Sequence, residues 1–460
     1  MVQIFTHYVP GRLIILAVLE ALVLLLAACF GLSLHIGGVS GSTAIIPSQV
    51  AAFTIGMVIV MSSMGLYDWD AWDDRQPVGA RLAGAFLLGF SILVLVSYLW
   101  PSVVPAPTVL GGTVAVALLG TWLVRAAFRR SNSLGSFKSR VLVLGTGSRV
   151  APLAEHARRN GNNEIVGYVS LRPSTHYVPP SSVLTLIPGE TILSLAEKHS
   201  IDQIVVAIRD RRGGGLPVQQ LLECKARGIK VVELATYFER EYRQVMLESL
   251  NPSWMVLGDG FRQDIVNRGV KRIFDLIAGS TLLVVALPVI FISGLFIYLE
   301  SGGPVFYRQK RVGRGGRIFT LYKLRSMRQD AECDGTAHWA RRNDDRVTAV
   351  GRFIRKWRID ELPQVFNVLR GEMSVIGPRP ERPPFVQQLE KQIPYYALRH
   401  SAKPGITGWA QVRYPYGASV DDAVEKLQYD LYYVKNRCLF LDVMILLATI
   451  EVVVWGRGAR

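Results

Sequence analysis

The chain has 460 residues, of which 50% are hydrophobic and only 19% are charged. Average soluble domains carry about 25% charged residues, so this composition excludes a disordered protein and argues against an ordinary soluble enzyme. The 52 Lys and Arg residues outnumber the 36 Asp and Glu residues, which gives a net charge of +16. Such an excess favours phosphate-bearing ligands, anionic lipid headgroups or nucleic acid as binding partners.

Four apolar segments open the chain, and each approaches the ~20 residues that a helix needs to cross a bilayer. They cover residues 13–34, 50–66, 82–100 and 107–124. The loop between the second and third segments and the region after the fourth contain basic residues, whereas the other two loops contain none. By the positive-inside rule, this pattern predicts a four-helix transmembrane unit over residues 1–130, with everything after residue 124 in the cytoplasm.

An acidic residue, Glu20, lies inside the first apolar segment. Ionisable groups in membrane helices are often functional. Because Glu20 is only a few residues from the start of the segment, we expect snorkelling or a helix–helix hydrogen bond and assign it no role in function.

From about Lys138 the sequence changes to buried strands that alternate with helical segments. Residues 140–144, 165–169, 204–208 and 229–234 are typical of buried strands, and helical patterns lie between them. Strands that alternate with helices predict a parallel sheet, and hence a Rossmann-like α/β domain over residues 138–262.

A glycine turn follows the first of these strands. Gly145 and Gly147 could present backbone amides to a pyrophosphate. The third glycine of a GxGxxG motif is replaced by Val150, and no acidic ribose ligand follows a second strand. We therefore favour a docking or regulatory domain, with nucleotide binding as the alternative.

Residues 276–299 are uncharged and long enough to span a membrane, but basic residues lie on both sides of them. Both flanks therefore favour the cytoplasmic side. Pro288, near the middle, removes a helical hydrogen bond and bends the axis. This pattern predicts a re-entrant helix–break–helix hairpin over residues 273–299 that enters one leaflet and returns. The alternative is a fifth full span with a proline kink.

Basic and proline-punctuated motifs fill the last third of the chain. They are, in order, GPVFYRQKRVG (303–313), YKLRSM (322–327), GRFIR (351–355), DELPQ (360–364), NVLRGEMS (367–374), GPRP (377–380) and KPGITGWAQ (403–411). This series resembles the catalytic domain of bacterial polyprenyl-phosphate phosphoglycosyl transferases, the exopolysaccharide sugar transferase family. We therefore predict a mainly helical catalytic domain with some α/β structure over residues 268–460. The apolar segments and the α/β domain ahead of it resemble the large form of that family.

The resemblance implies a membrane enzyme that transfers a sugar 1-phosphate from a UDP-sugar to undecaprenyl phosphate, releases UMP and uses Mg²⁺. It implies a covalent phosphosugar–aspartate intermediate on Asp360, and a metal held by Glu361 together with Asp360. The implied location is the bacterial inner membrane, with the catalytic domain on the cytoplasmic face, at the first membrane step of exopolysaccharide or other glycan assembly. The implied partners are the two substrates and the bilayer, with no nucleic acid; a homodimer through the α/β domain is left open.

Phosphoryl transfer depends on positioning and charge neutralisation, so cations should surround Asp360. Lys323 and Arg325 are two residues apart on a predicted strand, and their side chains should share a face. Arg355 precedes Asp360 by five residues, and Arg379 lies between two prolines that restrict its backbone. We predict that these four basic side chains bind phosphate oxygens.

Four further residues are weaker candidates. Trp409 and Gln411 could contact the uracil or the sugar, and core packing of Trp409 is an equal alternative. Asp344 and Asp345 could add metal ligands, although a solvated turn is the favoured interpretation.

The final apolar segment, residues 439–455, is interrupted by Asp442 and Glu451. These charges favour a helix that packs at the membrane interface over a full span.

Two other functions compete with the transferase. One is a non-catalytic membrane scaffold whose α/β domain senses a nucleotide. The other is an NAD-dependent sugar-nucleotide enzyme built on Gly145 and Gly147, which would need a general acid/base pair that the sequence does not offer near this loop. The sequence does not identify the sugar.

Overall fold

The computed structural model describes most of the chain, in two compact units. One unit joins Met1–Ala127 to Asp259–Arg460, and the other is Phe128–Gly258. The amino-terminal helices and the last third of the chain therefore pack together, a grouping that the sequence pattern did not predict. The described ranges are 2–36, 47–67, 78–133, 138–159, 163–171, 177–208, 216–250, 260–331 and 345–454. Within these ranges, residues 5, 102, 103, 105, 188, 262, 263, 330, 415, 416 and 418 are left out.

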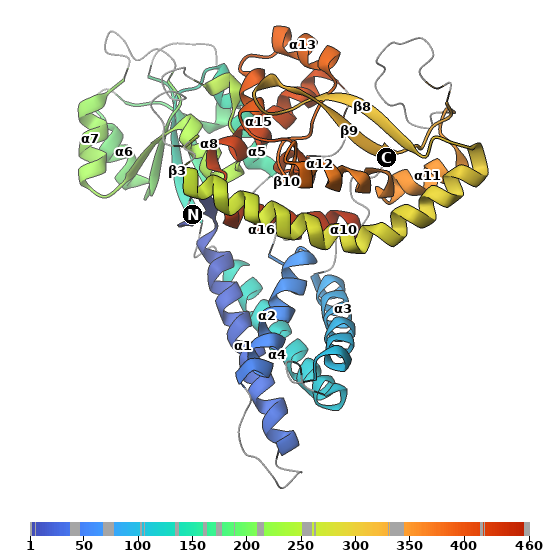
Figure 1. The fold of residues 1–460 in the computed structure, drawn as a ribbon. Helices are drawn as coiled ribbons and strands as arrows, with labels where there is room; N and C mark the ends of the chain where they lie inside the picture. The colour runs from blue at the N-terminus through green and yellow to red at the C-terminus, as the bar shows by residue number, and fades with distance from the viewer. Residues whose placement is uncertain are drawn as a thin grey trace. The chain divides into compact units, whose positions relative to one another are not determined.

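The chain begins with an antiparallel hairpin and four apolar helices. Strands β1 (Val2–Ile4) and β2 (His7–Val9) pair with each other. The helices are α1 (Gly11–Ile36), α2 (Pro47–Ser63), α3 (Val78–Leu99) and α4 (Pro107–Ser133), which run side by side in Figure 1. Three of them, α1, α3 and α4, are long and apolar enough to cross a membrane, whereas α2 is a shorter apolar helix. The prediction of four apolar helices is confirmed.

A buried ion pair joins α1 to α4. Arg125 Nε lies 2.6 Å from Glu20 Oε1, and Arg125 Nη2 donates a hydrogen bond of 2.9 Å to Glu20 Oε2. Arg125 Nη1 also donates to the carbonyl of Leu66, which follows α2. Both charged side chains are buried. The expected helix–helix hydrogen bond at Glu20 is therefore confirmed.

A second buried pair connects the helical bundle to the end of the chain. Arg81 on α3 lies 3.7 Å from Glu451 on α16 (Leu439–Val454). Gly65 makes this contact possible, because a Cβ at this position would lie 2.2 Å from the carboxyl carbon of Glu451. The other acid of α16, Asp442, is also buried and paired, with Lys271. The two acids that interrupt this apolar helix therefore serve its packing inside the protein.

The second unit contains a five-stranded parallel sheet in the order β5-β4-β3-β6-β7. Alternate residues of the central strands enter two cores, one containing Val141, Val143 and Val205, the other Leu142 and Leu144. The predicted parallel α/β sheet is confirmed, but a specifically Rossmann-like arrangement is not. The strands are β3 (Ser139–Leu144), β4 (Asn163–Val169), β5 (Val183–Leu184), β6 (Gln203–Val206) and β7 (Lys230–Glu233); the helices are α5 (Ala151–Arg159), α6 (Ile192–Lys198), α7 (Val218–Ala226) and α8 (Leu234–Tyr242).

The glycine turn of this sheet is used in its own packing. The amide of Gly145 donates a hydrogen bond of 2.8 Å to the carbonyl of Val169. Its φ of 122° lies in the region that favours glycine, and a Cβ would lie 3.3 Å from the backbone of Ala207. These constraints explain Gly145 without a ligand, and nucleotide binding stays the alternative to a docking or regulatory domain.

The last third of the chain is mainly helical with two small two-stranded sheets, as predicted. Strands β8 (Phe306–Val312) and β9 (Ile318–Leu324) are antiparallel, and β10 (Ser374–Ile376) and β11 (Gly405–Thr407) are parallel. The helices are α10 (Ile265–Ser301), α11 (Ala349–Lys356), η6 (Ile359–Gln364), α12 (Val365–Arg370), α13 (Pro383–Gln392), η7 (Tyr396–Ser401), α14 (Trp409–Arg413), α15 (Val420–Asn436) and α16.

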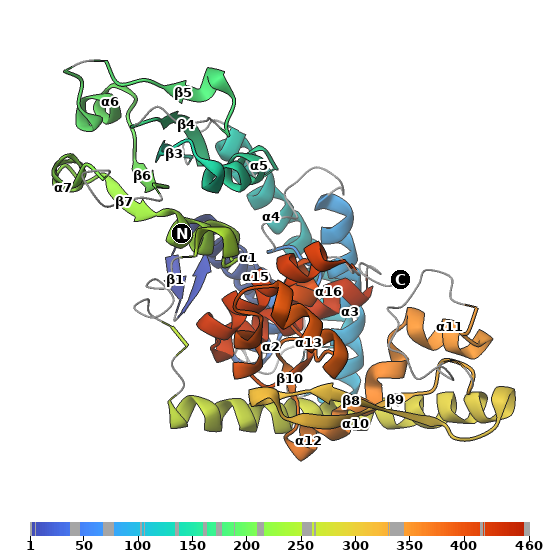
Figure 2. The same ribbon diagram turned by 90° about the horizontal axis from the view of Figure 1, so that it is seen from above.

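The segment predicted as a hairpin forms one helix of 37 residues, α10, with Pro288 inside it. Its axis changes direction near the middle in Figure 1, but the helix does not break, so a re-entrant hairpin is not confirmed. In Figure 2 it runs along the edge of the segments that follow it in the chain, and α11 and α12 pack against it. Near its start Asp275 accepts a hydrogen bond from Ser374, and near its end Glu300 accepts one from the amide of Ala349. Both ends of α10 therefore contact the part of the chain that follows this helix, which we call the polar domain.

Candidate functional site

The two adjacent carboxylates lie on η6, a short 3₁₀ helix between α11 and α12. Asp360 and Glu361 are 8% and 9% exposed. Arg358, the residue immediately before η6, adopts a left-handed conformation with φ 55° and ψ 22° and separates this helix from α11. Non-glycine residues rarely adopt this conformation, and it persists only where surrounding contacts offset its cost. The local backbone thus places both acids in the interior, facing β9.

Glu361 is held by two cations. Lys323 Nζ on β9 donates a hydrogen bond of 2.9 Å to Glu361 Oε1, and Arg379 Nη2 donates one of 2.6 Å to the same oxygen. Burial alone would raise the pKa of Glu361, but Arg379 and Lys323 outweigh it and hold the pKa well below its usual range. Glu361 is therefore ionised at neutral pH and positioned from two sides.

Asp360 differs from its neighbour. Its side chain has no hydrogen-bond or ion-pair partner among the residues that the structure describes. Burial and the charge of Glu361 raise the pKa of Asp360 to about 6, against the opposing effect of Lys323, Arg355 and Arg379. The carboxylate is largely ionised at neutral pH, and its oxygens are available to a ligand.

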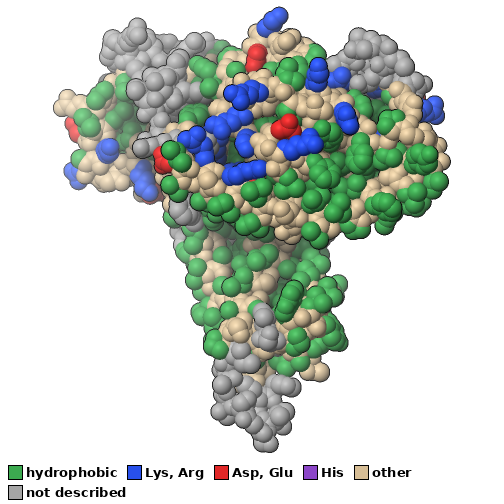
Figure 3. All heavy atoms as spheres, in the orientation of Figure 1, with side chains coloured by type: hydrophobic (Ala, Val, Ile, Leu, Met, Phe, Trp, Pro, Cys, Tyr) green, Lys and Arg blue, Asp and Glu red, His purple; other side chains and the backbone are tan. Residues whose placement is uncertain are grey.

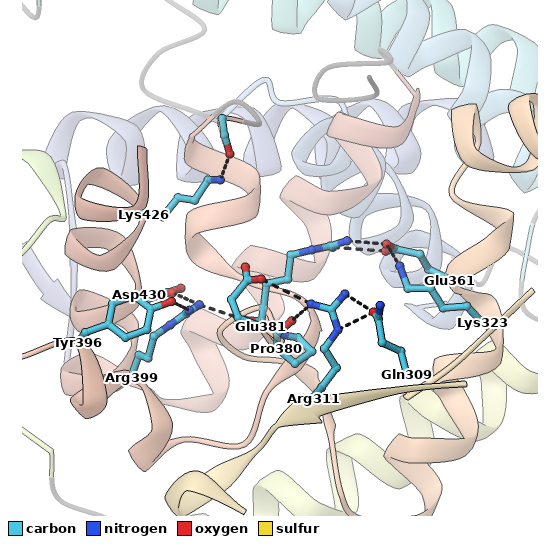
Figure 4. A network of polar contacts seen from close by, with 12 residues as sticks. Gln309, Arg311, Lys323, Glu361, Pro380, Glu381, Tyr396, Arg399, Lys426 and Asp430 are labelled. Atoms are coloured by element: carbon cyan, nitrogen blue, oxygen red, sulfur yellow. Dashed lines mark hydrogen bonds and ion pairs between the residues drawn. The ribbon is translucent and has the colours of Figure 1, made fainter. Parts of the chain in front are cut away.

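The loop that carries Arg379 is anchored on both sides (Figure 4). Arg399 Nη2 donates to the main-chain carbonyl of Arg379 at 3.0 Å, and Arg311 Nη1 donates to that of Pro380 at 3.0 Å. Arg399 is itself paired with Asp430, 2.7 Å away, and both side chains are buried. Sequence analysis missed Arg311, Arg399 and Asp430, because no local motif distinguishes residues that support a site from the other charges around them.

The other two predicted phosphate ligands lie in different surroundings. Arg325 is buried, and its Nη2 donates to the side chain and carbonyl of Ser301 and to the carbonyl of Gly302. It therefore caps the end of α10, while Lys323 reaches Glu361. The charge of Arg355 lowers the pKa of Asp360. The structure thus groups Lys323, Arg355 and Arg379 with the two acids.

The predicted aromatic contact, Trp409, is in the core. It is 4% exposed, its ring centroid lies 5.8 Å from that of His7, and the guanidinium of Arg413 lies 4.7 Å from its centroid. The His7 ring in turn lies 2.9 Å from the hydroxyl of Tyr432. Trp409 therefore anchors the amino-terminal hairpin, which leaves little of its ring for a ligand.

Gln411 retains an unused acceptor. Its Nε2 donates to the carbonyl of Ile406 at 3.2 Å, while its Oε1 is buried without a hydrogen-bond partner in the described part of the chain. A contact between Gln411 and a nucleotide or sugar stays a prediction.

Asp360 and Glu361 are also the groups that could hold a metal ion. Within the described residues, no three His, Cys, Asp or Glu side chains gather into a metal cluster. Mg²⁺ is usually bound by one or two carboxylates together with substrate phosphates and water, and two adjacent acids, one of them without a partner, fit this donor set. Of the two additional candidates, Asp345 is exposed, and Asp344 lies outside the described residues.

Comparison with known proteins places this geometry in context. The model of the bacterial sugar transferase family matches residues 266–456, which include η6, β9 and the loop of Arg379. The UDP-glucose:undecaprenyl-phosphate glucose-1-phosphate transferase of Xanthomonas campestris pv. campestris is 32% identical over 356 residues, which are 74% of this chain and 71% of the relative.

Two further relatives match over shorter regions. The UDP-N-acetylgalactosamine-undecaprenyl-phosphate N-acetylgalactosaminephosphotransferase of Aeromonas hydrophila is 41% identical over 259 residues, 56% of this chain and 60% of the relative. The undecaprenyl-phosphate glucose phosphotransferase of Komagataeibacter xylinus is 43% identical over 194 residues, 41% of this chain and 36% of the relative. The chain thus spans less than two thirds of the length of these two proteins.

Proposed function

The chain belongs to the bacterial sugar transferase family, and on that premise we propose that it is a phosphoglycosyl transferase. Its substrates would be a UDP-sugar and undecaprenyl phosphate, and its reaction would pass through a phosphosugar held on Asp360 as an acyl phosphate. The relatives named above support the substrate classes.

One observation carries the proposal. Asp360 is a buried carboxylate without a partner in the described structure, and it lies beside a carboxylate that two cations hold in place. A structural acid would be expected to use its oxygens in ion pairs or hydrogen bonds, because burying an unpaired charge is costly. A nucleophile, in contrast, needs its oxygens free for the phosphorus atom.

The chemistry proceeds in two displacements. A carboxylate oxygen of Asp360 attacks the β-phosphorus of the UDP-sugar, the bond from that phosphorus to the bridging oxygen breaks, and UMP leaves with the electron pair. A phosphate oxygen of undecaprenyl phosphate then attacks the same phosphorus, and the bond from that phosphorus to the carboxyl oxygen of Asp360 breaks to restore the carboxylate. The product is a sugar linked to undecaprenol by a diphosphate.

The cations around Asp360 make such an attack feasible. A carboxylate and a pyrophosphate repel each other, so the reaction needs positive charge near both. Arg379, held through its carbonyl by Arg399, can form bidentate hydrogen bonds with phosphate oxygens. Lys323 and Arg355 add charge from β9 and α11. Glu361, with Asp360, would hold Mg²⁺, which would neutralise charge on the phosphate oxygens when bound.

Helix α10 would place this site at the membrane. Its outward face exposes large apolar side chains such as Ile277, Val284 and Phe291, whereas both of its ends contact the polar domain. We propose that the bend near Pro288 dips into the inner leaflet of the bacterial inner membrane and that both ends stay on the cytoplasmic side. The acceptor phosphate, at headgroup depth, could then reach Asp360 at the first membrane step of glycan assembly.

A UMP-release assay tests the proposal. Detergent-solubilised protein would be incubated with undecaprenyl phosphate and each of a panel of UDP-sugars, because the relatives carry the names of different sugars. We expect UMP from at least one donor, and a loss of at least about 10³-fold with Asp360→Asn. Asp421→Asn, a change of an exposed acid on α15, is the matched control and should retain activity. UMP release at the normal rate by Asp360→Asn would refute the nucleophile, and no release from any donor would favour a non-catalytic scaffold.

A further inference from the structure

A cavity of about 200 Å³ opens beside the amino-terminal half of α10. It lies between that helix, the turn of the β8–β9 hairpin, the segment before β11 and the junction of α15 with α16. Six basic residues line it: Arg268, Lys271, Arg272, Arg314, Lys403 and Arg437. The described residues of its lining include neither Asp360 and Glu361 nor the cations grouped with them. It is therefore separate from the proposed active site.

The cavity also contains two carboxylates, but internal contacts use them. Lys271 Nζ lies 2.9 Å from Asp442 Oδ2 and 3.5 Å from Asp275 Oδ1. Asp275 also accepts a hydrogen bond of 2.8 Å from Ser374 Oγ, and Asp442 accepts one of 2.8 Å from the hydroxyl of Tyr433. Both acids lie within ion-pair distance of Lys271, and six basic side chains in the lining exceed these two acids by four.

Four of the six cations have no counter-ion in the described structure. The side chains of Arg268, Arg314, Lys403 and Arg437 form no hydrogen bond or ion pair with the described residues, and Nε of Arg437 is fully buried. A fifth, Arg272, donates only to the carbonyls of Val368 and Leu369, at 2.7 and 2.6 Å. The cavity therefore holds a surplus of donors without acceptors.

The basic side chains of the cavity also repel one another, which adds to burial in lowering the pKa values of two of them. Burial, followed by the charges of Arg272, Arg314 and Lys271, lowers the pKa of Lys403 against the opposing effect of Asp275. Burial likewise lowers the pKa of Arg437 to about 10. Arg314 and Arg268 act in the same direction, and Tyr433 and Asp442 oppose them. A bound anion would relieve both the desolvation and the repulsion.

Apolar side chains of α10 and α16 contribute to the rim of the cavity. Val270 and Leu439 line the cavity and are 40% and 43% exposed, and Ile273 and Ile277 continue the exposed apolar face along the helix. Figure 3 shows one face of the molecule on which Lys and Arg side chains form a band above a region rich in hydrophobic side chains. A cationic cavity bordered by exposed apolar side chains matches a ligand with an anionic head and an apolar tail.

We propose that this cavity binds the phosphate of an anionic phospholipid headgroup, while the acyl chains lie along the exposed apolar face of α10. Arg and Lys donors around one phosphate provide the charge-assisted hydrogen bonds that such a group requires. The site would hold the amino-terminal half of α10 at headgroup depth. This inference goes beyond the proposed transfer reaction, because it uses none of the residues assigned to that reaction.

The test uses full-length protein in neutral detergent micelles and measures its melting temperature by intrinsic fluorescence. Phosphatidylglycerol added to the micelles should raise the melting temperature by about 3–5 °C, whereas phosphatidylcholine and an equal concentration of inorganic phosphate should not. The double variant Lys403→Gln/Arg437→Gln should lose this shift. The matched control Lys198→Gln/Lys391→Gln, which removes two exposed cations elsewhere, should keep it.

Three results would overturn the proposal. One is an undiminished shift in the cavity variant, and another is an equal shift with phosphatidylcholine or with inorganic phosphate. The third is a shift that undecaprenyl phosphate produces and phosphatidylglycerol does not, since this would assign the cavity to the acceptor substrate. If Lys403→Gln/Arg437→Gln fails to fold, Arg268→Gln/Arg314→Gln replaces it, because both of these side chains are exposed.

Discussion

Arg399 donates a hydrogen bond of 3.0 Å to the main-chain carbonyl of Arg379, while the same guanidinium nitrogen lies 2.7 Å from Asp430. The buried pair of Arg399 and Asp430 thus fixes the backbone of the residue that holds Glu361. Arg399 on η7 and Asp430 on α15 thus position Arg379, which in turn contacts Glu361 on η6.

Asp430→Asn should therefore affect both stability and activity. It leaves the charge of Arg399 buried without its counter-charge, and breaking a buried pair in this way costs about 3–5 kcal/mol. We expect a melting temperature lower by several degrees and a reduced kcat/KM for the UDP-sugar, because Arg379 loses its anchor. The control is Asp421→Asn, on the exposed face of the same helix. Equal melting temperatures of the Asp430 variant and the wild type would show that the pair does not support the loop.

Glu361→Gln should weaken the response to metal. The variant keeps the shape of the side chain but loses the charge that Lys323 and Arg379 contact. We expect UMP release to fall by about 10²-fold or more and to require a higher Mg²⁺ concentration for half-maximal rate. The measurement is a Mg²⁺ titration of UMP release, with Glu390→Gln on the exposed side of α13 as control. An unchanged Mg²⁺ requirement would argue against Glu361 as a metal ligand.

Local patterns predicted much of the fold. The apolar segments, the strand at Lys323 and the parallel sheet follow from periodicity and composition, and the DE pair with the proline-flanked Arg379 indicated the site. The structure brings Lys323 and Arg379 to Glu361, although they come from different elements.

The rest depends on contacts between distant segments, which local patterns do not specify. The motif at Lys323 and Arg325 could not reveal that Arg325 caps the end of α10, because this depends on where the helix ends in space. Nor could the motif around Trp409 reveal that His7 packs on its ring. The hydrogen bond from Arg399 to the carbonyl of Arg379 also joins separate segments, so a local motif could not predict it.

Glu20→Gln should destabilise the helical bundle. Arg125 would keep a buried charge whose partner is gone, in surroundings that offer no water. We expect a melting temperature lower by several degrees in detergent. The double variant Glu20→Leu/Arg125→Leu removes both charges and should be more stable than the single variant. If the single variant and the wild type have the same melting temperature, the pair contributes nothing to the stability of the bundle.

His400 should make stability depend on pH. Burial and the neighbouring Arg399 lower its pKa to about 4, whereas an unfolded histidine titrates near 6.5. Between about pH 6.5 and 4 the unfolded chain therefore binds a proton that the folded chain does not, and the free energy of unfolding falls as the pH falls. His400→Asn should reduce the drop in melting temperature between pH 7 and pH 5, with His199→Asn as control. An equal drop in the His400 variant and the wild type would contradict this prediction.

The account rests on a covalent acyl phosphate at Asp360, and isotope transfer tests it most directly. Protein incubated with a UDP-sugar labelled at the β-phosphorus, without undecaprenyl phosphate, would be denatured rapidly, digested and mapped by mass spectrometry. The account predicts one labelled peptide with the phosphosugar on Asp360, and loss of that label when undecaprenyl phosphate is added before denaturation. UMP release with no label on Asp360, or label on another residue, would contradict it.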